Sequence, residues 1–358
     1  MNAVKLNAVG GELLTQLPLT PDAYPQALDP VRGRVLVVRL DASGYRAASF
    51  LDDRLLGPAT QGAWLTLARV AEAARQVRSP RPLHFIFHTG HVGSTLVSRL
   101  LDETGVLLSL REPLPLRTIA DLHDVLGGPE SLLSESQFRM LLDMMLSLWS
   151  RGHDWTRAVV VKATSSAGRL AGTLLEARPD ARAVYLNLPA ETYLATLLGG
   201  ANSSIDLRGH GPGRMRRLAA RGIRPYGPLH SLSTGELAAL GWLVETLSLR
   251  DAVRQFPHRV LALDFETVLA DVAGVMARVA GHFGLPPDAR YLAGVARSSV
   301  LQRYSKAPEL PFPHGERAAR LEESRRRNRD EILRGLGWLE KVAQTDDAAA
   351  ALAATGLA

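Results

Sequence analysis

The 358-residue sequence contains no cysteine. This absence excludes disulfide bonds, thiolate metal ligands and a cysteine nucleophile. No apolar run approaches the length of a membrane span. The N-terminus, MNAVKLNAVGGELLTQLPLTPDAY, also lacks the basic segment and apolar core of a signal peptide. We therefore expect a cytoplasmic protein that does not enter a membrane.

Acidic residues are the minority among the charged ones, with 36 Asp and Glu against 42 Lys and Arg and a net charge of +6. Arginine supplies nearly all of the excess, and its planar fork suits oxyanions. A GC-rich genome would give the same bias. Aromatic and basic residues do not alternate as they do in nucleic-acid modules. Anionic small ligands are therefore the expected partners, and nucleic acid is not.

Apolar strands alternate with helices over residues 80–342, which predicts a three-layer α/β sandwich with a central, mainly parallel sheet of the P-loop NTPase-like type. Residues 1–79 predict a small extension: a β-hairpin of RVLVVRL and YRAASFLDDR around a DASG turn, then a helix over about residues 61–77. Residues 199–232 lack periodicity and predict a long irregular segment. The alanine-rich residues 343–358 predict a flexible tail.

Ligands of parallel α/β sheets bind beyond the carboxyl ends of the strands. The segment FIFHTGHVGSTLVSRLLDE, residues 85–103, predicts a strand, a tight glycine loop and a helix that begins at Ser94. Gly90 and Gly93 allow the loop amides to face an anion, and Ser94 and Thr95 add hydroxyls at the positive end of the helix. The loop therefore predicts a site for a phosphate-like or sulfate-like group. A glycine turn capped by Ser94 is the simpler alternative.

The lysine of a Walker loop is missing from this segment. Gly93 and Thr95 match the Walker spacing, but His88 stands at its first glycine and Ser94 at its lysine. Only Asp264, in LALDFE, follows a strand where a Mg²⁺-binding aspartate is needed. A Mg-nucleotide-dependent kinase or NTPase with a degenerate loop therefore stays open as an alternative.

Two charged residues follow the next strands. Glu112, after LLSLR, is placed to take a proton from a substrate hydroxyl. Lys162 ends AVVVK and can point at the same anion. A base, a cation and a loop of amides suffice to move a sulfuryl group without a metal, because this group carries less charge than a phosphoryl group. The alternatives are a surface ion pair of Glu112 with Arg111 or Arg117 and a solvated Lys162.

The loop Gly-His-Val-Gly-Ser-Thr-Leu, residues 90–96, resembles the Pro-Arg-Ser-Gly-Thr-Thr-Leu loop of P-loop sulfotransferases that use 3′-phosphoadenosine 5′-phosphosulfate (PAPS). RPDARAVYL, LALDFETVLADVAGVMARVAGHFGLP and RYSKAP are similar to later segments of that family, in the same order, over about residues 80–340. The bacterial and tyrosylprotein branches look most similar. In the tyrosylprotein branch a catalytic glutamate follows the loop at the spacing that separates Glu112 from Thr95.

The resemblance implies transfer of a sulfuryl group from PAPS to a hydroxyl or amine of a small-molecule or peptide acceptor, with no metal required. It implies catalytic roles for Glu112, His91 and Lys162. It implies donor binding by Gly90, Val92, Gly93, Ser94, Thr95, Leu96, Thr196 and Arg208. The acceptor is expected to lie among residues 115–150 and 199–232.

The sequence departs from the family at two positions. His91 stands where the family keeps a lysine or arginine, so the charge of the loop would depend on pH. The arginine that binds the 3′-phosphate of the donor is also absent, since its position falls on Leu188, or on Asn187 after a one-residue shift, with Thr196 at the partner serine. Three arginines of the irregular segment are candidates to replace it: Arg208, Arg214 and Arg217. Otherwise the donor differs, or the chain is a non-catalytic nucleotide-binding protein of the same fold.

His84, His88 and His91 are close in sequence, but no carboxylate shares their spacing, so they do not predict a metal site. Asp264 and Glu266 are expected to bind neighbouring backbone. Residues 325–327, three consecutive arginines, are expected to form a solvated helix face.

Overall fold

A five-stranded sheet forms the centre of the computed structural model, which describes residues 3–200, 203–224, 226–285, 288–313 and 315–345. Its strand order is β5-β6-β4-β7-β8, and all four pairings are parallel. The strands are β4 (Leu83–His88), β5 (Leu107–Arg111), β6 (Ala158–Lys162), β7 (Ala183–Asn187) and β8 (Val260–Asp264). The predicted parallel α/β sheet is confirmed.

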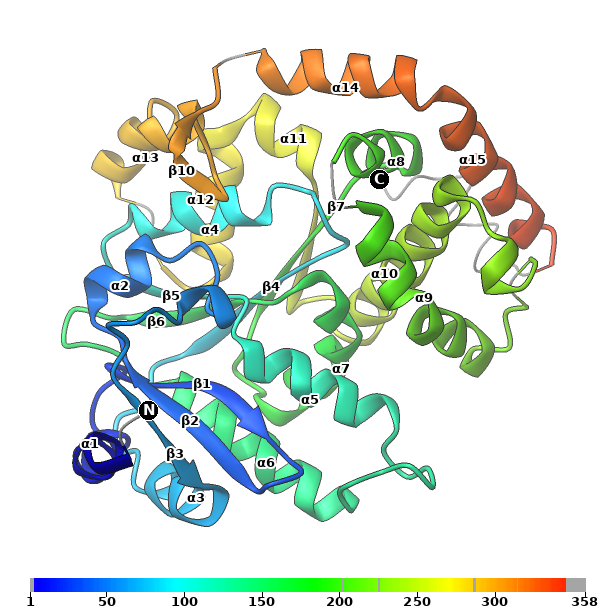
Figure 1. Cartoon of the computed structure of the whole chain (residues 1–358). Helices are drawn as coiled ribbons and strands as arrows, with labels where there is room; N and C mark the ends of the chain where they lie inside the picture. The colour runs from blue at the N-terminus through cyan, green and yellow to red at the C-terminus, as the bar shows by residue number, and fades with distance from the viewer. Residues whose placement is uncertain (1–2, 201–202, 225, 286–287, 314, 346–358) are drawn as a thin grey trace.

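Helices cover both faces of this sheet (Figure 1). Successive strand residues point to opposite faces, so Phe85 and Phe87 belong to one hydrophobic core and Ile86 to the other. The first core packs under α5 (Leu114–Asp124), α6 (Glu135–Trp149) and α7 (Ala171–Ala177). The second packs under α4 (Ser94–Asp102), α8 (Ala190–Leu198), α10 (Thr234–Gln255) and α12 (Val272–His282). The three-layer sandwich is thus confirmed.

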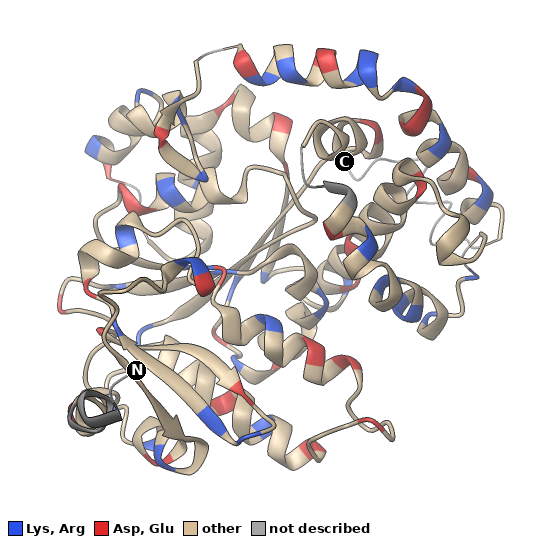
Figure 2. Ribbon diagram, in the orientation of Figure 1, with Lys and Arg blue, Asp and Glu red and all other residues tan. Residues whose placement is uncertain are grey.

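The C-terminal third adds a small hairpin and outer helices. These elements are α11 (Phe265–Ala270), α13 (Ala289–Val295), β9 (Arg303–Tyr304), β10 (Ala307–Pro311), α14 (Glu316–Arg327) and α15 (Arg329–Ala343). Acidic and basic residues alternate along α14 and α15 (Figure 2). The tail predicted from residue 343 lies, from residue 346 on, outside the described residues. None of the described helices is both long and apolar enough to cross a membrane.

The prediction that residues 199–232 form an irregular segment is wrong. It contains helix α9 (Ser203–Ala220), with Pro212 inside it. Leu207 and Leu218 of this helix are buried in the core that α10 also lines. Packing of these leucines outweighs the low helix propensity of the Gly-rich and Pro-containing sequence.

The N-terminal region is a three-stranded antiparallel sheet with helices, made of α1 (Ala3–Gln16), β1 (Ala23–Asp29), β2 (Arg34–Arg39), α2 (Ala42–Ala47), β3 (Gly62–Thr66) and α3 (Leu67–Arg75). The predicted hairpin of RVLVVRL with YRAASFLDDR is wrong, because RVLVVRL contains β2, which pairs with β1 and β3. YRAASFLDDR starts inside α2, whose N-terminus is capped by the Asp41 side chain. Of the helix predicted over about residues 61–77, only Leu67–Arg75 is helical, because residues 62–66 form β3.

Arg111 joins this region to the sheet. Its side chain is 1% exposed and pairs with Asp102. It also donates to the Ser98 hydroxyl at 3.1 Å and to the carbonyls of Tyr45 and Ala48 at 2.9 and 2.8 Å. Burial lowers the pKa of Arg111 to about 9. The segment after α2 is therefore fixed against β5 and α4 by one buried guanidinium.

We expect Arg111→Met to lower the free energy of unfolding by about 3 kcal/mol or more, because Asp102 and two carbonyls lose their partner inside the protein. Urea unfolding measures this. Arg75→Met, which removes an exposed pair with Glu72, is the matched control and should cost less than about 1 kcal/mol. Equal losses in the two variants would contradict the assigned role.

Candidate active site

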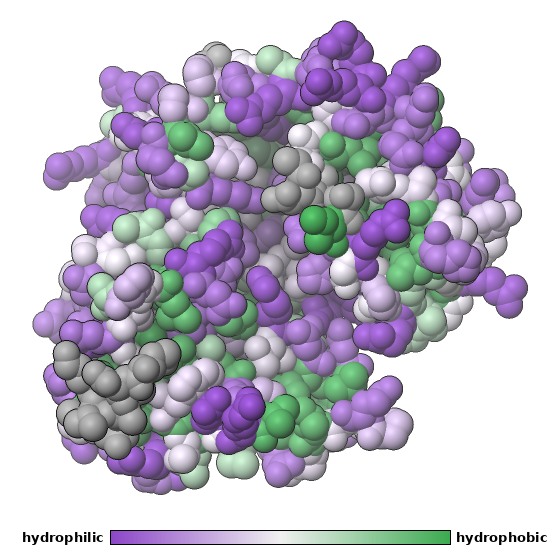
Figure 3. Space-filling model, viewed as in Figure 1, coloured by the Kyte–Doolittle hydropathy of each residue, from purple (hydrophilic) through white to green (hydrophobic). Residues whose placement is uncertain are grey.

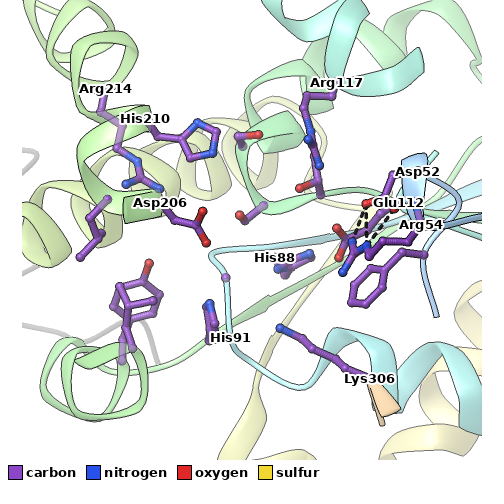
Figure 4. Close-up of a pocket in the computed structure, with 18 of the residues that line it drawn as sticks. Asp52, Arg54, His88, His91, Glu112, Arg117, Asp206, His210, Arg214 and Lys306 are labelled. Carbon is purple, nitrogen blue, oxygen red and sulfur yellow. Dashed lines mark hydrogen bonds and ion pairs between the residues drawn. The ribbon is translucent and has the colours of Figure 1, made fainter. Parts of the chain in front are cut away.

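A cavity of about 630 Å³ opens at the carboxyl ends of β4, β5 and β6. Its walls come from the loop after β4, the ends of β5 and β6, helices α5, α8 and α9, residues 50–54, and the turn between β9 and β10. The molecular surface is hollowed near the centre of the face in Figure 3, where hydrophilic side chains gather. Figure 4 shows the charged side chains of the cavity converging from these separate elements.

The loop after β4 presents unpaired donors at the start of α4. The first backbone bond of this helix runs from the Val97 amide to the Gly93 carbonyl, at 3.1 Å. The amides of Ser94, Thr95 and Leu96 therefore have no acceptor within the helix. The Thr95 hydroxyl is buried and has no hydrogen-bond partner among the described residues. Free amides and an unpartnered hydroxyl at a helix N-terminus fit an anion.

Gly93 is required at its position for two reasons. Its φ is +69°, and a Cβ there would lie 2.0 Å from the ring of Phe265. Gly90 also has a positive φ, of +108°. Val92 is fully buried in the core and Leu96 packs against it, so these two residues can offer an anion only their backbone amides.

Glu112 and Lys162 form an ion pair at the ends of β5 and β6. The Lys162 side chain is 1% exposed and that of Glu112 is 11% exposed, while the Glu112 amide donates to the Lys162 carbonyl at 2.6 Å. Among the described residues, Glu112 (φ 52°) and His91 (φ 54°) are the non-glycine residues with positive φ. Strained backbone of this kind clusters at functional sites. Glu112 thus contacts Lys162, rather than Arg111 or Arg117 as in the alternative interpretation.

A second lysine lies near Glu112. Burial lowers the pKa of Lys162 and of Lys306, and the negative charge of Glu112 opposes both shifts. Lys306 lies in the turn between β9 and β10, which Arg99 holds by donating to the Ser305 carbonyl at 2.8 Å. Lys306 is a functional candidate that sequence reasoning missed. Its only signal was the family-like segment RYSKAP.

Two of the cavity histidines, His88 and His91, have lowered pKa values. His88 donates from Nε2 to the Ala163 carbonyl at 2.9 Å, and burial, followed by the charge of Lys162, holds its pKa well below the usual value. Desolvation in the cavity also lowers the pKa of His91, and Lys306 and Lys162 add to this shift. The lowered pKa favours the neutral imidazole of His91 when no anion is bound.

The residues expected at the 3′-phosphate of a donor are engaged elsewhere. Leu188 is fully buried, and its carbonyl accepts from Trp242 Nε1 at 2.9 Å. Asn187 accepts from the Thr89 hydroxyl at 2.9 Å. The Thr196 hydroxyl donates to a carbonyl of its own helix at 2.7 Å. The structure does not bring these residues to the cavity wall.

The three candidate arginines have three different positions. Arg208 is exposed and lies outside the cavity lining. Arg217 donates to the fully buried Glu245 at 3.0 Å. Only Arg214 lines the cavity, and Figure 4 shows it on α9 beside Asp206 and His210.

The N-terminal region supplies part of the wall. Phe50, Asp52 and Arg54 line the cavity. Arg54 Nε donates to Asp52 at 2.8 Å, and its guanidinium stacks on Phe50, with 3.5 Å from Cζ to the ring centroid. No motif marks these residues. Only the contact of the extension with β5 brings them to the site.

Asp264 caps α11, accepting from the amides of Glu266 and Thr267 at 2.8 and 3.3 Å. This is the backbone role expected of it, and Glu266 pairs with Arg317 instead. His84 stacks on Phe283. Within the described ranges, no three His, Cys, Asp or Glu side chains gather as a metal site.

No family model matches the chain, and no curated protein is significantly similar to it. Solved sulfotransferases do resemble its structure. Mouse sulfotransferase SULT7A1 complexed with PAP is 10% identical over 79% of this chain and 92% of that one, with a TM-score of 0.40. The sulfotransferase of Alicyclobacillus acidocaldarius is 18% identical over 59% and 85%, at 0.34. STF9 of Mycobacterium avium is 14% identical over 72% and 78%, at 0.38. Identities and scores this low carry no weight for the reaction, which depends on the side chains of the site.

We expect Gly93→Ala to lower the free energy of unfolding by about 2–5 kcal/mol and to weaken sulfate binding, because the new Cβ meets Phe265 in a strained backbone conformation. Gly105→Ala is the control: its φ is +72° and nothing lies within 4 Å of its Cβ position. It should cost about 1–2 kcal/mol from strain alone and leave sulfate binding intact. Chemical unfolding and calorimetric sulfate titration separate the two, and equal behaviour would contradict the close packing of the loop.

The affinity for sulfate should rise as the pH falls from about 7.5 to 5.5, because a bound dianion raises the lowered pKa of His91 and protons are taken up on binding. Sulfate itself does not titrate in this range. In His91→Asn the dependence should flatten, whereas in His91→Lys the affinity at pH 7.5 should increase. An unchanged slope in His91→Asn would show that His91 does not contact the anion.

Proposed function

We propose that this cavity transfers a sulfuryl group from PAPS to a hydroxyl or amine acceptor. The observation that carries the proposal is the position of Glu112. The backbone of Glu112 is in the left-handed region, and its carboxylate forms an ion pair with the buried Lys162. The loop after β4, at the same edge of the sheet, carries amide and hydroxyl donors that have no partner among the described residues. Glu112 lines the cavity together with Gly90 and His91 of the loop, so a candidate base and the first part of a candidate oxyanion loop face the same space.

In the proposed step the acceptor oxygen or nitrogen attacks sulfur in line. The new bond to sulfur forms as the bond between sulfur and the bridging phosphate oxygen breaks. Glu112 accepts the proton of the acceptor, and the electron pair leaves on the phosphate of adenosine 3′,5′-bisphosphate. Charge develops on the leaving oxygen, where Lys162, Lys306 and the loop amides stabilise it.

The phosphosulfate end of the donor fits the loop, since the Thr95 hydroxyl and the amides of Ser94 and Thr95 lack partners there. The 3′-phosphate end does not fit the positions expected from the family, because Asn187 and Leu188 are engaged with Thr89 and Trp242. This mismatch favours one second candidate, a non-catalytic nucleotide-binding protein. A Mg-nucleotide enzyme is less well supported, because Asp264 is committed to capping α11.

Glu112→Gln should lower the rate of sulfuryl transfer by about 10²–10⁴-fold while retaining donor binding, because the amide cannot take the proton. Calorimetry with adenosine 3′,5′-bisphosphate measures binding, and its formation from PAPS with a panel of phenols and alcohols measures turnover. Glu130→Gln, at an exposed position, is the control and should match the wild type.

Two outcomes would count against the proposal. If the wild type failed to bind the bisphosphate at millimolar concentration, PAPS would be the wrong donor. If it bound the bisphosphate but Glu112→Gln left turnover unchanged, or the wild type transferred no sulfuryl group to any acceptor, the non-catalytic alternative or another base would be favoured.

A further inference from the structure

Arg214 is a buried cation in the cavity wall, and no other described residue pairs with it. The residue is 6% exposed, and its Nε and Nη1 atoms have no hydrogen-bond acceptor. Its guanidinium lies against Gly241 of α10, where a Cβ would come within 3.1 Å of Cζ. Packing on a glycine, rather than an ion pair, thus fixes its position. A buried guanidinium with unused donors is costly unless a ligand satisfies it.

A second arginine faces the same part of the cavity. Arg117 of α5 lines it together with His210 of α9. Desolvation lowers the pKa of His210, and the charges of Arg214 and Arg117 lower it further. Figure 4 shows these three side chains on the opposite side of the cavity from Lys306.

The positive charges of Arg214 and Arg117 differ from those of Arg54 and Lys162, because no ion pair with a described residue balances them. Arg54 is paired with Asp52 and Lys162 with Glu112. Among the described residues, by contrast, no salt bridge joins Arg214 to Asp206, the carboxylate that shares this wall. The cavity is therefore lined by cations in two places, Lys306 in the β9–β10 turn and Arg214 with Arg117 on the α9 and α5 walls, and Glu112 lines the same cavity.

We propose that Arg214, assisted by Arg117, binds an anionic group of the acceptor, such as a carboxylate, sulfate or phosphate. This rests on the proposed function and narrows the acceptor class to hydroxyl or amine compounds that carry a negative charge. The loop binds the phosphosulfate, the acceptor hydroxyl lies at Glu112, and the acceptor's anionic group lies at the α9 wall. An uncharged acceptor would leave the Arg214 donors unsatisfied, which disfavours it.

The same chemistry could come from the second phosphate of the donor. Two calorimetric comparisons therefore test the site. One compares 4-hydroxybenzoate, 4-hydroxyphenylacetate and 3-(4-hydroxyphenyl)propionate with their neutral amides. The other compares adenosine 3′,5′-bisphosphate with adenosine 5′-monophosphate. Each is made on the wild type, Arg214→Gln and Arg216→Gln, the last being the matched loss of an exposed arginine from the same helix.

We expect at least one carboxylate to bind the wild type and Arg216→Gln about tenfold more tightly than its amide, because a charge-assisted bond to Arg214 is lost with the charge. In Arg214→Gln this preference should disappear, while the preference for the bisphosphate over the monophosphate stays as in the wild type. Circular dichroism and thermal unfolding confirm that the variant is folded.

Three results would overturn the proposal: no carboxylate preference in the wild type, a preference that persists in Arg214→Gln, or loss of the bisphosphate preference in that variant. The last would assign Arg214 to the donor. Acceptor binding is measured without nucleotide. A failure of the donor assignment, seen as no bisphosphate binding to the wild type, is therefore distinct from a failure at Arg214.

Discussion

The ion pair of Glu112 with Lys162 is the constraint on which the rest of the site depends. In the parallel sheet Arg111 lies opposite Lys162, so the residue after β5 reaches the end of β6. Both charges leave water, and removing one partner of such a pair typically costs about 3–5 kcal/mol. The left-handed backbone of Glu112 persists because this pair and its amide bond to Lys162 hold it. One contact thus fixes two strand ends and turns a carboxylate toward the cavity.

The N-terminal region and the C-terminal hairpin are fixed relative to this strand end by two arginines. Arg111 holds the backbone of Tyr45 and Ala48. Arg99 donates to the Ser49 hydroxyl at 2.7 Å and to the Ser305 carbonyl. Residues 50–54 and Lys306 consequently meet at the cavity although they come from opposite ends of the chain. The extension is therefore part of the cavity wall as well as a covering of the sheet.

Local signals explain what could be predicted from the sequence. The loop glycines, Glu112 and Lys162 each follow an apolar strand, and parallel strands bring their carboxyl ends to one edge. Lys306 and Arg54 could not be found this way, because their positions depend on contacts between distant segments rather than on any motif. Helix α9 was missed because its glycines and Pro212 have low helix propensity, whereas the burial of Leu207 and Leu218 and the ion pair of Arg217 with Glu245, which stabilise it, depend on contacts with other elements. Arg214 was one of three candidate arginines in the sequence, of which Arg208 was the one assigned to the donor, and only the structure of α9 shows that Arg214 lines the cavity.

The position of Lys306 gives a physical account of His91. The family that the sequence resembles carries a permanent cation in the loop, whereas desolvation and two nearby lysines keep His91 neutral here. Positive charge at this point therefore comes from β6 and from the β9–β10 turn, outside the loop. A third permanent cation beside Lys162 and Lys306 would add like-charge repulsion whenever no anion is bound. A histidine avoids this repulsion, yet it can still donate a hydrogen bond or gain a proton when a dianion arrives.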